Sequence, residues 1–346
     1  MTVGRLGESG IIQRLADRVG RMDPHGRLEC GIGDDGAVAV FGAGDRLVFT
    51  TDVLIEDVHF RRCWMPARSL GHKVLAVSLS DLAAMGATPE LFLLDLGLPA
   101  AWPVADLDAL ADGLAQLASR HGVGLAGGDT VVSPRLHVGV SAIGRIGREQ
   151  TAVRRVGGQP GDAIAVSGSL GGAAAGLALL EDGWRWTDEG PRPPTRGGTR
   201  LIDPVLAGQA LRAHLEPEPE VDLGTRLPGA VSAGVDLSDG LSRDLARLCE
   251  ASGCGARIDA ARVPVAPAAR LIFDALGQDP VVASLAGGED YRLLVCGRHL
   301  ETAGEALADD LTVVGELEPV DAGLRLRTDA GLEPLPEPAF THFSSP

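Results

Sequence analysis

The sequence predicts an α/β protein of two domains, and three observations support this fold class. The chain has 346 residues, more than a single compact domain commonly needs. Strand-like and helix-like segments alternate in both halves. The alternation breaks at residues 147–161, which are rich in Gly and Arg. We therefore expect an N-terminal domain over residues 1–148 and a C-terminal domain over residues 149–346.

The N-terminal half alternates strands and helices. A strand over residues 47–51 is expected to end in an acidic turn. A helix follows over residues 69–86, because Ser69 can cap its start and Gly86 can close its end. The remaining elements are a buried strand over 91–98, an amphipathic helix over 104–121 and a period-two strand over 136–142.

The C-terminal half repeats this alternation. Its expected elements are strands over 162–167, 231–235, 291–296 and 311–314 and helices over 170–181 and 240–252. Residues 183–199 are rich in Gly, Pro and Arg, which predicts a mobile surface loop. Residues 167–172 resemble a phosphate loop but lack its lysine, so we expect them to pack a helix closely on a strand.

The charge of the chain restricts its partners. The formal net charge is −16, whereas nucleic acids and anionic membrane surfaces bind basic faces. We therefore expect neither a nucleic acid nor a membrane as a partner. An acidic protein can still bind phosphates if metal ions lie between the two sets of negative charge. Because Lys73 is the only lysine, metal ions rather than lysines would have to neutralise such phosphates.

Cysteine usage and hydropathy indicate the compartment. The five cysteines form no C-x-x-C pair, which argues against a disulfide framework or a zinc site. The sequence contains no run of about 18 apolar residues, so we expect no membrane-spanning helix. Together these features predict a cytoplasmic protein.

Aspartates recur on short segments that also contain glycine or a hydroxyl residue. Five segments share this design: Gly33-Asp34-Asp35-Gly36, Thr50-Thr51-Asp52, Ser80-Asp81, Gly127-Gly128-Asp129-Thr130 and Asp236-Leu237-Ser238-Asp239-Gly240. Most of them are expected to follow a strand or to lie at a helix end. Asp81 is the exception, because it lies inside the predicted helix over residues 69–86.

Magnesium is the ion that this design suits. Mg2+ takes hard oxygen ligands, commonly one or two carboxylates together with substrate phosphates. Glycine lets the backbone approach a phosphate, and hydroxyl groups add neutral oxygens. One Asp-Gly pair is usually only a turn, but clustered carboxylates would repel one another unless cations are present. The set therefore predicts several Mg2+ ions that bind the phosphates of a nucleotide, and hence a phosphoryl-transfer site.

Three residues outside these segments have two interpretations each. His59 follows the Asp52 segment, where it contacts a ligand or is a structural histidine. Arg154 and Arg155 lie at the expected domain boundary, where they reach a phosphate or form a solvated surface pair.

The end of the chain holds two further candidates. Residues 287–291, Gly-Gly-Glu-Asp-Tyr, come at the start of a predicted strand and suggest an approach to a ligand or, alternatively, a β-bulge. Phe340 and Phe343 lie in a polar tail of a chain that has few aromatic residues. They anchor the tail or stack on an aromatic ligand.

The order of these motifs resembles the thiamine-monophosphate kinases, a family within the aminoimidazole ribonucleotide synthetase-like enzymes. The resemblance runs from Gly31 to Phe343. Residues 79–87, Leu-Ser-Asp-Leu-Ala-Ala-Met-Gly-Ala, and residues 287–291 are specific together. The other matching motifs are Gly-Ile-Gly-Asp-Asp, Thr-Thr-Asp, Val-His-Phe, Gly-Gly-Asp-Thr and Asp-Leu-Ser-Asp-Gly-Leu.

The resemblance implies a fold and an activity. The fold would be α/β (α+β), with two domains of mixed sheets covered by helices and with N-terminal domains that pair in a homodimer. ATP and thiamine phosphate would react to give ADP and thiamine diphosphate. The N-terminal domain would bind ATP and Mg2+, and the C-terminal domain would complete the substrate site. Because the phosphate nucleophile has a second pKa near ~6, it is ionised at neutral pH and no general base is expected.

The resemblance also assigns residues to roles. The implied metal ligands are Asp35, Thr50, Thr51, Asp52, Asp81, Asp129, Asp236 and Asp239. The implied ATP contacts are Gly128, Asp129, Arg155 and Ser238, and the implied contacts to thiamine phosphate are His59, Glu289 and Phe340. Asp57 departs from the family pattern, because glycine is common at its position. Since Arg154 and Arg155 are adjacent, either of them could face ATP.

Two alternatives stay open at this point. The first is another ATP-using enzyme of the superfamily, such as aminoimidazole ribonucleotide synthetase, which a substrate screen would reveal. The second is a non-catalytic nucleotide or metal sensor, which would bind ATP and Mg2+ without forming ADP with any acceptor.

Overall fold

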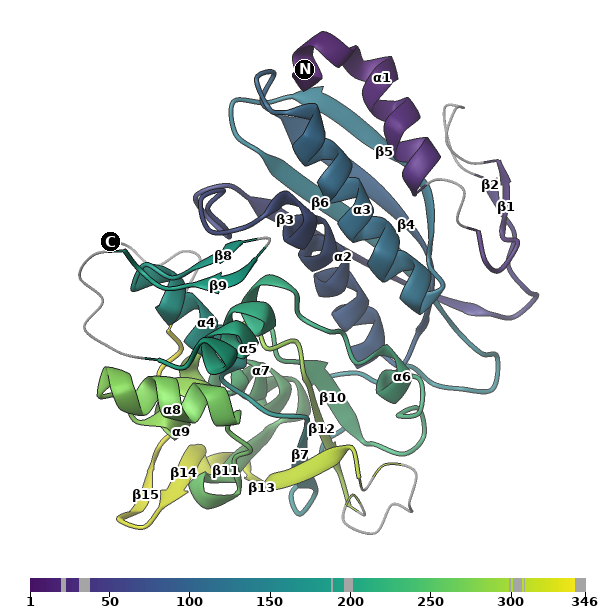
Figure 1. The fold of residues 1–346 in the computed structure, drawn as a ribbon. Coiled ribbons are helices and arrows are strands. Elements are labelled where there is room, and N and C mark those ends of the chain that lie inside the picture. The colour runs from purple at the N-terminus through teal and green to yellow at the C-terminus, as the bar shows by residue number, and fades with distance from the viewer. Residues whose placement is uncertain are drawn as a thin grey trace. The chain divides into compact units, whose positions relative to one another are not determined.

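The structure is a computed structural model that describes residues 1–19, 23–30, 38–187, 189–195, 202–298, 300, 307 and 309–339. The chain groups into two compact units. Unit 1 comprises Met1–Leu82 and Ala87–Gln150, and unit 2 comprises Ala83–Gly86 and Thr151–Pro346. Each unit contains a mixed sheet with helices, so the predicted α/β fold class is confirmed (Figure 1).

Unit 1 is built on a four-stranded sheet in the order β3-β6-β4-β5. Strand β6 (His137–Ile146) pairs antiparallel with both β3 (Arg46–Ile55) and β4 (Thr88–Leu98). Strand β5 (Gly124–Val132) runs parallel to β4 at the edge of the sheet. The sheet is therefore mixed, as the family resemblance implies.

Helices α2 (Ala67–Ala84) and α3 (Val104–His121) lie side by side over one face of this sheet (Figure 1). Two glycines let their backbones approach closely. A Cβ atom on Gly71 would lie 2.0 Å from the carbonyl oxygen of Leu110, and one on Gly113 would lie 2.0 Å from that of Arg68. The buried leucines of α3 recur at helical spacing, at positions Leu107, Leu110, Leu114 and Leu117.

The helix ends agree closely with the predicted ones. Helix α3 covers the predicted residues, and the left-handed Gly122 (φ 63°) closes it. Gly86 (φ 74°) donates its N–H to the carbonyl of Ala83 and closes α2, as predicted. The predicted start of α2 was wrong, because the helix begins at Ala67 and Ser69 is buried inside its first turn.

Two acidic segments lie inside strands, although turns were expected at Asp52 and at residues 127–130. Residues 50–52 lie inside β3, whose ladder with β6 is continuous over its whole length. Residues 127–130 lie inside β5 and pair with β4. The predictions were wrong because both segments find backbone partners on a neighbouring strand, which Gly and Asp content alone does not indicate. Successive side chains in a strand point to opposite faces, and this divides the acidic groups between two faces.

The remaining elements of unit 1 lie outside this sheet. Helix α1 (Val3–Arg18) packs against α3 and β5, and its Arg14 forms an ion pair with Asp108 at 2.7 Å. Strands β1 (Leu28–Cys30) and β2 (Val38–Ala39) form a separate antiparallel pair.

Unit 2 is built on a seven-stranded sheet in the order β10-β12-β7-β13-β11-β14-β15. All neighbours pair antiparallel except β11 and β14, which are parallel. The strands are β7 (Ala163–Ser167), β10 (Ala233–Asp236), β11 (Cys254–Asp259), β12 (Leu293–Gly297), β13 (Leu311–Pro319), β14 (Leu324–Thr328) and β15 (Gly331–Pro334). All four strands predicted for this half are present.

The helices of unit 2 follow the predicted alternation. Helices α4, α5, α8 and α9 pack against one another. The α-helices are α4 (Gly172–Glu181), α5 (Pro204–Leu215), α6 (Val221–Gly224), α7 (Leu241–Ser252), α8 (Pro267–Leu276) and α9 (Pro280–Ala286). Two short 3-10 turns, Ala260–Arg262 and Val320–Ala322, precede α8 and β14.

The predicted loop over residues 183–199 contains a short hairpin. Strands β8 (Arg185–Thr187) and β9 (Gly190–Arg192) pair antiparallel. The guanidinium of Arg212 on α5 lies 5.4 Å from the ring centre of Trp186. The prediction of a loop was therefore wrong for this part, because an aromatic residue gives the segment a surface to pack on. Residues 188 and 196–199 of the predicted loop lie outside the described part of the chain.

In the described ranges, every helix is too short or too polar to cross a membrane.

Candidate functional site

Two aspartates of unit 1 meet between β3 and α2. Thr50 and Asp52 are two positions apart on β3, so both side chains point to the face that α2 covers. Ser78 and Asp81 lie about one helical turn apart on α2 and reach the same place. The Ser78 hydroxyl donates a hydrogen bond of 3.1 Å to Oδ2 of Asp52, and the Thr50 hydroxyl donates to Oδ2 of Asp81. Three of the predicted metal ligands are thus brought together, and we call Asp52 and Asp81 the aspartate pair.

The aspartate pair is electrostatically unfavourable without a cation. Burial raises the pKa of Asp52, and the negative charge of Asp81 raises it further, to about 6. The hydrogen bond from Ser78 acts in the opposite direction but does not compensate. A positive ion between these carboxylates would remove the repulsion. The available donors are carboxylate and hydroxyl oxygens, which is the donor set that Mg2+ prefers.

Other predicted ligands of unit 1 lie on the opposite face of its sheet. The hydroxyl of Thr51 is 3.0 Å from that of Ser141 on β6. Asp129 pairs in register with Asp95 of β4, which places both carboxylates on the face that Thr51 shares. The structure therefore divides the predicted metal ligands of unit 1 between two faces.

Gly128 must be a glycine for a steric reason. A Cβ atom at this position would lie 1.9 Å from the carbonyl oxygen of Leu94 on the paired strand. The neighbouring Asp129 is exposed, and its Oδ1 accepts a hydrogen bond of 2.8 Å from the N–H of Thr130. At this edge of the sheet, Gly128 therefore leaves its backbone uncovered and Asp129 presents a carboxylate.

His59 lies in the turn that follows β3. Its Nδ1 accepts a hydrogen bond of 3.1 Å from the N–H of Ile55, so in the neutral ring the proton lies on Nε2. Asp57 in the same turn has φ 64°, the left-handed conformation that glycine adopts most easily. Glycine, which is common at this position in the family, would adopt this conformation without strain, whereas Asp57 adopts it with some backbone strain.

Four predicted site residues of unit 2 lie on two adjoining loops. The first loop runs from Asp236 to Asp239 between β10 and α7, and the second precedes β12. The N–H of Glu289 donates to the carbonyl of Ser238 at 2.8 Å, and the N–H of Tyr291 donates to that of Leu237 at 2.9 Å. Backbone hydrogen bonds therefore join the loop that follows Asp236, at the end of β10, to the loop that contains Glu289.

Asp239 is surrounded by groups that the sequence did not single out. Its N–H donates to Oδ2 of the buried Asp244 at 2.9 Å. Arg247 bridges the two carboxylates, at 2.7 Å from Asp239 and 3.2 Å from Asp244. Burial raises the pKa of Asp244 to about 6, although the nearby charges of Arg247 and Arg155 oppose this rise. Arg155 is thus within electrostatic range of Asp244.

The loop before β12 is strained and closely packed. Glu289 (φ 67°) and Tyr291 (φ 49°) both have left-handed backbones. Between them, the half-buried Asp290 accepts hydrogen bonds of 2.7 Å and 3.1 Å from the N–H groups of Gly171 and Ala173, at the start of α4. The N–H groups at the end of residues 167–172 therefore bind the carboxylate of Asp290, in the place where a phosphate loop would bind a phosphate. These residues also pack closely, because a Cβ atom on Gly171 would lie 2.0 Å from Oγ of Ser284.

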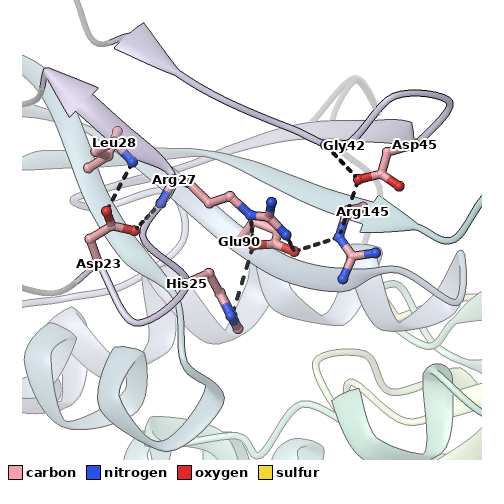
Figure 2. Close-up of polar contacts among 8 residues, drawn as sticks. All are labelled: Asp23, His25, Arg27, Leu28, Gly42, Asp45, Glu90 and Arg145. Carbon is pink, nitrogen blue, oxygen red and sulfur yellow. Dashed lines mark hydrogen bonds and ion pairs between the residues drawn. The ribbon is translucent and has the colours of Figure 1, made fainter.

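Unit 1 contains a second carboxylate cluster, built around Glu90 of β4 (Figure 2). The Glu90 side chain is fully buried. Its Oε2 accepts a hydrogen bond of 3.1 Å from Nε of Arg27, and its Oε1 accepts one of 2.8 Å from Nε of Arg145. Burial acts to raise the pKa of Glu90, but the hydrogen bonds from the two arginines outweigh it and hold the pKa below its usual value. We call these three residues the Glu90 clamp.

The Glu90 clamp fixes the chain on both sides of residues 31–37. Asp23 accepts hydrogen bonds of 2.9 Å from the backbone N–H groups of residues 27–28 (Figure 2). Asp45, on the other side, lies 3.8 Å from Nε of Arg145. Residues 31–37 include the predicted ligand Asp35 and lie outside the described part of the chain, as does Phe340.

No group of three or more His, Cys, Asp or Glu side chains is arranged to hold a metal within the described ranges. The aspartate pair nevertheless fits Mg2+, because this ion commonly takes one or two carboxylates and completes its shell with water and substrate phosphates.

Sequence reasoning missed Ser78, Asp244 and Arg247. Asp244 had a detectable signal, since an acidic residue in the first turn of α7 commonly bonds back to the N–H groups before the helix. Ser78 had a weaker one, because it lies one helical turn before Asp81. Arg247 had none, because its role depends on the packing of α7 beside the preceding loop.

Two family models match the chain. The model described as AIR synthase related protein, N-terminal domain, matches residues 33–146. The model described as AIR synthase related protein, C-terminal domain, matches residues 159–323.

Individual proteins resemble the chain over nearly its full length. The thiamine-monophosphate kinase of Escherichia coli (strain K12) is 35% identical over 356 residues, which cover 98% of this chain and 99% of that protein. The crystal structure of thiamine-monophosphate kinase from Stenotrophomonas maltophilia K279a is 36% identical with a TM-score of 0.77, covering 91% of this chain and 95% of that one. A structure of AaThiL complexed with AMPPCP and TMP is 28% identical with a TM-score of 0.72, covering 94% and 95%.

Proposed function

The chain belongs to the thiamine-monophosphate kinase family of AIR synthase related proteins, and we propose that it transfers the terminal phosphoryl group of ATP to thiamine phosphate. The products are ADP and thiamine diphosphate. The observation that carries this proposal is the aspartate pair, two carboxylates held together on a kinase-family sequence where a cation would relieve their repulsion.

The implied cation is Mg2+, and several ions are proposed. In unit 1 the carboxylates of Asp52 and Asp81 and the hydroxyl of Thr50 would hold one of them. The other proposed ligands are Asp35, Thr51, Asp129, Asp236 and Asp239. When bound, Mg2+ neutralises phosphate charge and stabilises the transferring phosphoryl group.

The protein's own groups bind and orient the two substrates. The proposed ATP contacts are Gly128, Asp129, Arg155 and Ser238. The bare backbone of Gly128 admits a close approach of a ligand, and the guanidinium of Arg155 offers planar donors to phosphate oxygens. The proposed contacts to thiamine phosphate are His59, Glu289 and Phe340. Nε2 of His59 has a proton to donate when the ring is neutral.

The reaction needs alignment more than proton transfer. A phosphate oxygen of thiamine phosphate attacks the terminal phosphorus of ATP while the bond to the bridging oxygen breaks and ADP leaves. The attacking phosphate has a second pKa near ~6 and is already ionised at neutral pH, so no general base is assigned. The contribution of the protein is to hold two polyanions close together and in line.

The open face of the unit 1 sheet supports a homodimer. Phe49 on this face is 68% exposed, and the neighbouring apolar side chains Leu47, Val53, Leu93 and Val131 are exposed as well. Exposed apolar side chains that gather on one sheet face are typical of an interface between copies of a chain. We also propose a cytoplasmic location, in agreement with the free thiols of Cys63, Cys249, Cys254 and Cys296.

One product assay tests the activity. The protein is incubated with ATP, Mg2+ and thiamine phosphate, and the products are separated. Equal amounts of ADP and thiamine diphosphate are expected. ADP formed only with a different acceptor from a substrate screen would identify a sister enzyme such as aminoimidazole ribonucleotide synthetase. Binding of ATP and Mg2+ without ADP from any acceptor would identify a sensor.

The homodimer is tested by the mass in solution, measured by light scattering after size exclusion. Phe49→Asp is expected to convert a dimer to a monomer, because it places a charge in the apolar face. Val205→Asp is a matched control, since Val205 is 69% exposed on α5 of unit 2. A wild-type protein that elutes as a monomer would contradict the homodimer.

A further inference from the structure

A buried histidine of unit 2 contacts the carboxylate of Glu289. Nδ1 of His214, near the end of α5, lies 3.1 Å from Oε2 of Glu289. The side chain of His214 is 6% exposed, and that of Glu289 is 26% exposed. One partner is therefore inside the protein, whereas the other reaches solvent. The two residues are far apart in the sequence, and the contact was not predictable from it.

The backbone of Glu289 is fixed on both sides. Its φ of 67° is unusual for a residue with a side chain, and such strain persists only where the surroundings enforce it. Gly288 before it packs against the neighbouring loop, since a Cβ atom there would lie 2.6 Å from the carbonyl oxygen of Ser238. Asp290 after it accepts two hydrogen bonds from the start of α4. The Cα–Cβ direction of Glu289 is thus determined by its neighbours.

The imidazole of His214 is fixed as well. Helices α4 and α5 approach closely at Gly176, where a Cβ atom would lie 2.2 Å from the carbonyl oxygen of Ala210 and 2.8 Å from Cβ of His214. A side chain on a helix that is packed this tightly has few orientations available. His214 therefore presents Nδ1 to Glu289 from a rigid support.

We propose that His214 is a positioning residue, which orients the Glu289 carboxylate toward thiamine phosphate. This inference rests on the proposed function. Oε2 of Glu289 lies against His214, and this contact sets the orientation of the carboxylate group. Thiamine phosphate carries a positive thiazolium ring and an aminopyrimidine amine, and a carboxylate attracts the first and accepts a hydrogen bond from the second. Without His214, the carboxylate samples other rotamers and binds this substrate less well.

The test separates positioning from a purely structural contact. His214→Phe keeps a ring and removes the nitrogen, whereas His214→Asn keeps a polar side-chain group close to the position of Nδ1. His214→Phe is expected to raise the KM for thiamine phosphate about tenfold, because the polar contact that orients the carboxylate is lost. The KM for ATP should stay near the wild-type value, and His214→Asn should recover most of the loss. Calorimetric titration with thiamine phosphate in the presence of AMPPCP gives the same comparison without turnover.

Arg212→Met is the matched control. It removes the cation next to Trp186 on the same helix and leaves the contact between His214 and Glu289 in place. This variant should lower the melting temperature without a selective change in the KM for thiamine phosphate. Equal rises in both KM values for His214→Phe, or no recovery in His214→Asn, would overturn the proposal and leave a structural contact.

Two further outcomes are also decisive. If His214→Phe does not fold, a double-mutant cycle with His214→Asn and Glu289→Gln replaces it. Coupling of the two changes in thiamine phosphate affinity supports the proposal, and additive effects overturn it. If the wild-type protein forms no thiamine diphosphate and binds no thiamine phosphate, the proposed function fails before any variant is compared, and this inference fails with it.

Discussion

The Glu90 clamp and the aspartate pair are both carboxylate clusters on the sheet of unit 1, but their electrostatics are opposite. Glu90 meets the guanidinium groups of Arg27 and Arg145, which hold its pKa below the usual value. Asp52 meets the carboxylate of Asp81, and burial together with this charge raises its pKa to about 6. The protein supplies the cations of the first cluster itself.

On the sheet of unit 1, this difference separates a structural carboxylate from a candidate cation site. A carboxylate that is neutralised by arginine contributes to the folded state at neutral pH. A carboxylate that is placed beside another carboxylate opposes folding in the absence of a cation, and such strain is typical of a ligand site. On this basis the aspartate pair is the position in unit 1 where the added cation belongs.

The largest expected effect is on activity. Asp81→Asn removes one carboxylate of the pair and should reduce turnover about 10^3-fold or more, because charge stabilisation in the transition state is lost. The metal-free variant should unfold at the same temperature as the wild type or above it, because the repulsion is also lost. Product formation and thermal melting measure the two effects. Asp112→Asn, a half-exposed carboxylate on α3, is the control. Wild-type turnover in Asp81→Asn would contradict the assignment.

For the Glu90 clamp we expect a large loss of stability and a small change in turnover, the reverse of the Asp81→Asn result. Glu90→Gln leaves Arg27 and Arg145 without their buried anion and should reduce the free energy of unfolding of unit 1 by about 3 to 4 kcal/mol. Turnover per folded molecule should change much less than in Asp81→Asn. Urea titration gives the stability, and activity below the unfolding transition gives the turnover. A loss of turnover without a loss of stability would show that Glu90 takes part in the chemistry.

A smaller effect is expected from pH, with opposite signs in the two clusters. The folded-state pKa of Asp52 lies above the unfolded value, so its stabilising contribution is present below pH ~4 and is lost as pH rises through about 6. Metal-free Asp52→Asn should therefore gain about 2 to 3 kcal/mol relative to the wild type between pH 4 and 7. The folded-state pKa of Glu90 is lowered, so its contribution is present above pH ~4.3 and is lost as pH falls.

The comparison requires that both variants be followed by urea unfolding at several pH values. The penalty of Glu90→Gln should be largest near pH 7 and should shrink in acid. Saturating Mg2+ should cancel the advantage of Asp52→Asn at pH 7, because the ion neutralises the wild-type pair. Parallel pH profiles for the two variants would show that the clusters do not differ as described.

The sequence predicted elements with strong periodicity well. Helix α3 covers residues 104–121 as expected, because its leucines recur at helical spacing and Gly122 closes it. The prediction failed at Asp52 and at residues 127–130, where turns were expected but the backbone pairs within strands. Turn propensity is a local property, whereas strand pairing depends on a partner that is distant in the sequence.

The candidate site was predictable in its residue types more than in its arrangement. The acidic segments and the family resemblance indicated Asp52 and Asp81, and the structure brings them together through Ser78 and Thr50. Once the segment is known to be a strand, Thr50 and Thr51 must point to opposite faces of the sheet, because successive side chains of a strand do so. The contact between His214 and Glu289 could not be predicted, because it joins a helix and a strained loop through tertiary packing.

The most direct test of the central claim is a calorimetric titration of Mg2+ into the protein, with and without AMPPCP. AMPPCP is expected to strengthen Mg2+ binding to the wild type, because phosphates complete the shell of an ion held by few carboxylates. Glu90→Gln should retain this binding below its unfolding transition, and Asp81→Asn should lose it. Unchanged Mg2+ binding in Asp81→Asn would contradict the claim that the aspartate pair is the cation site.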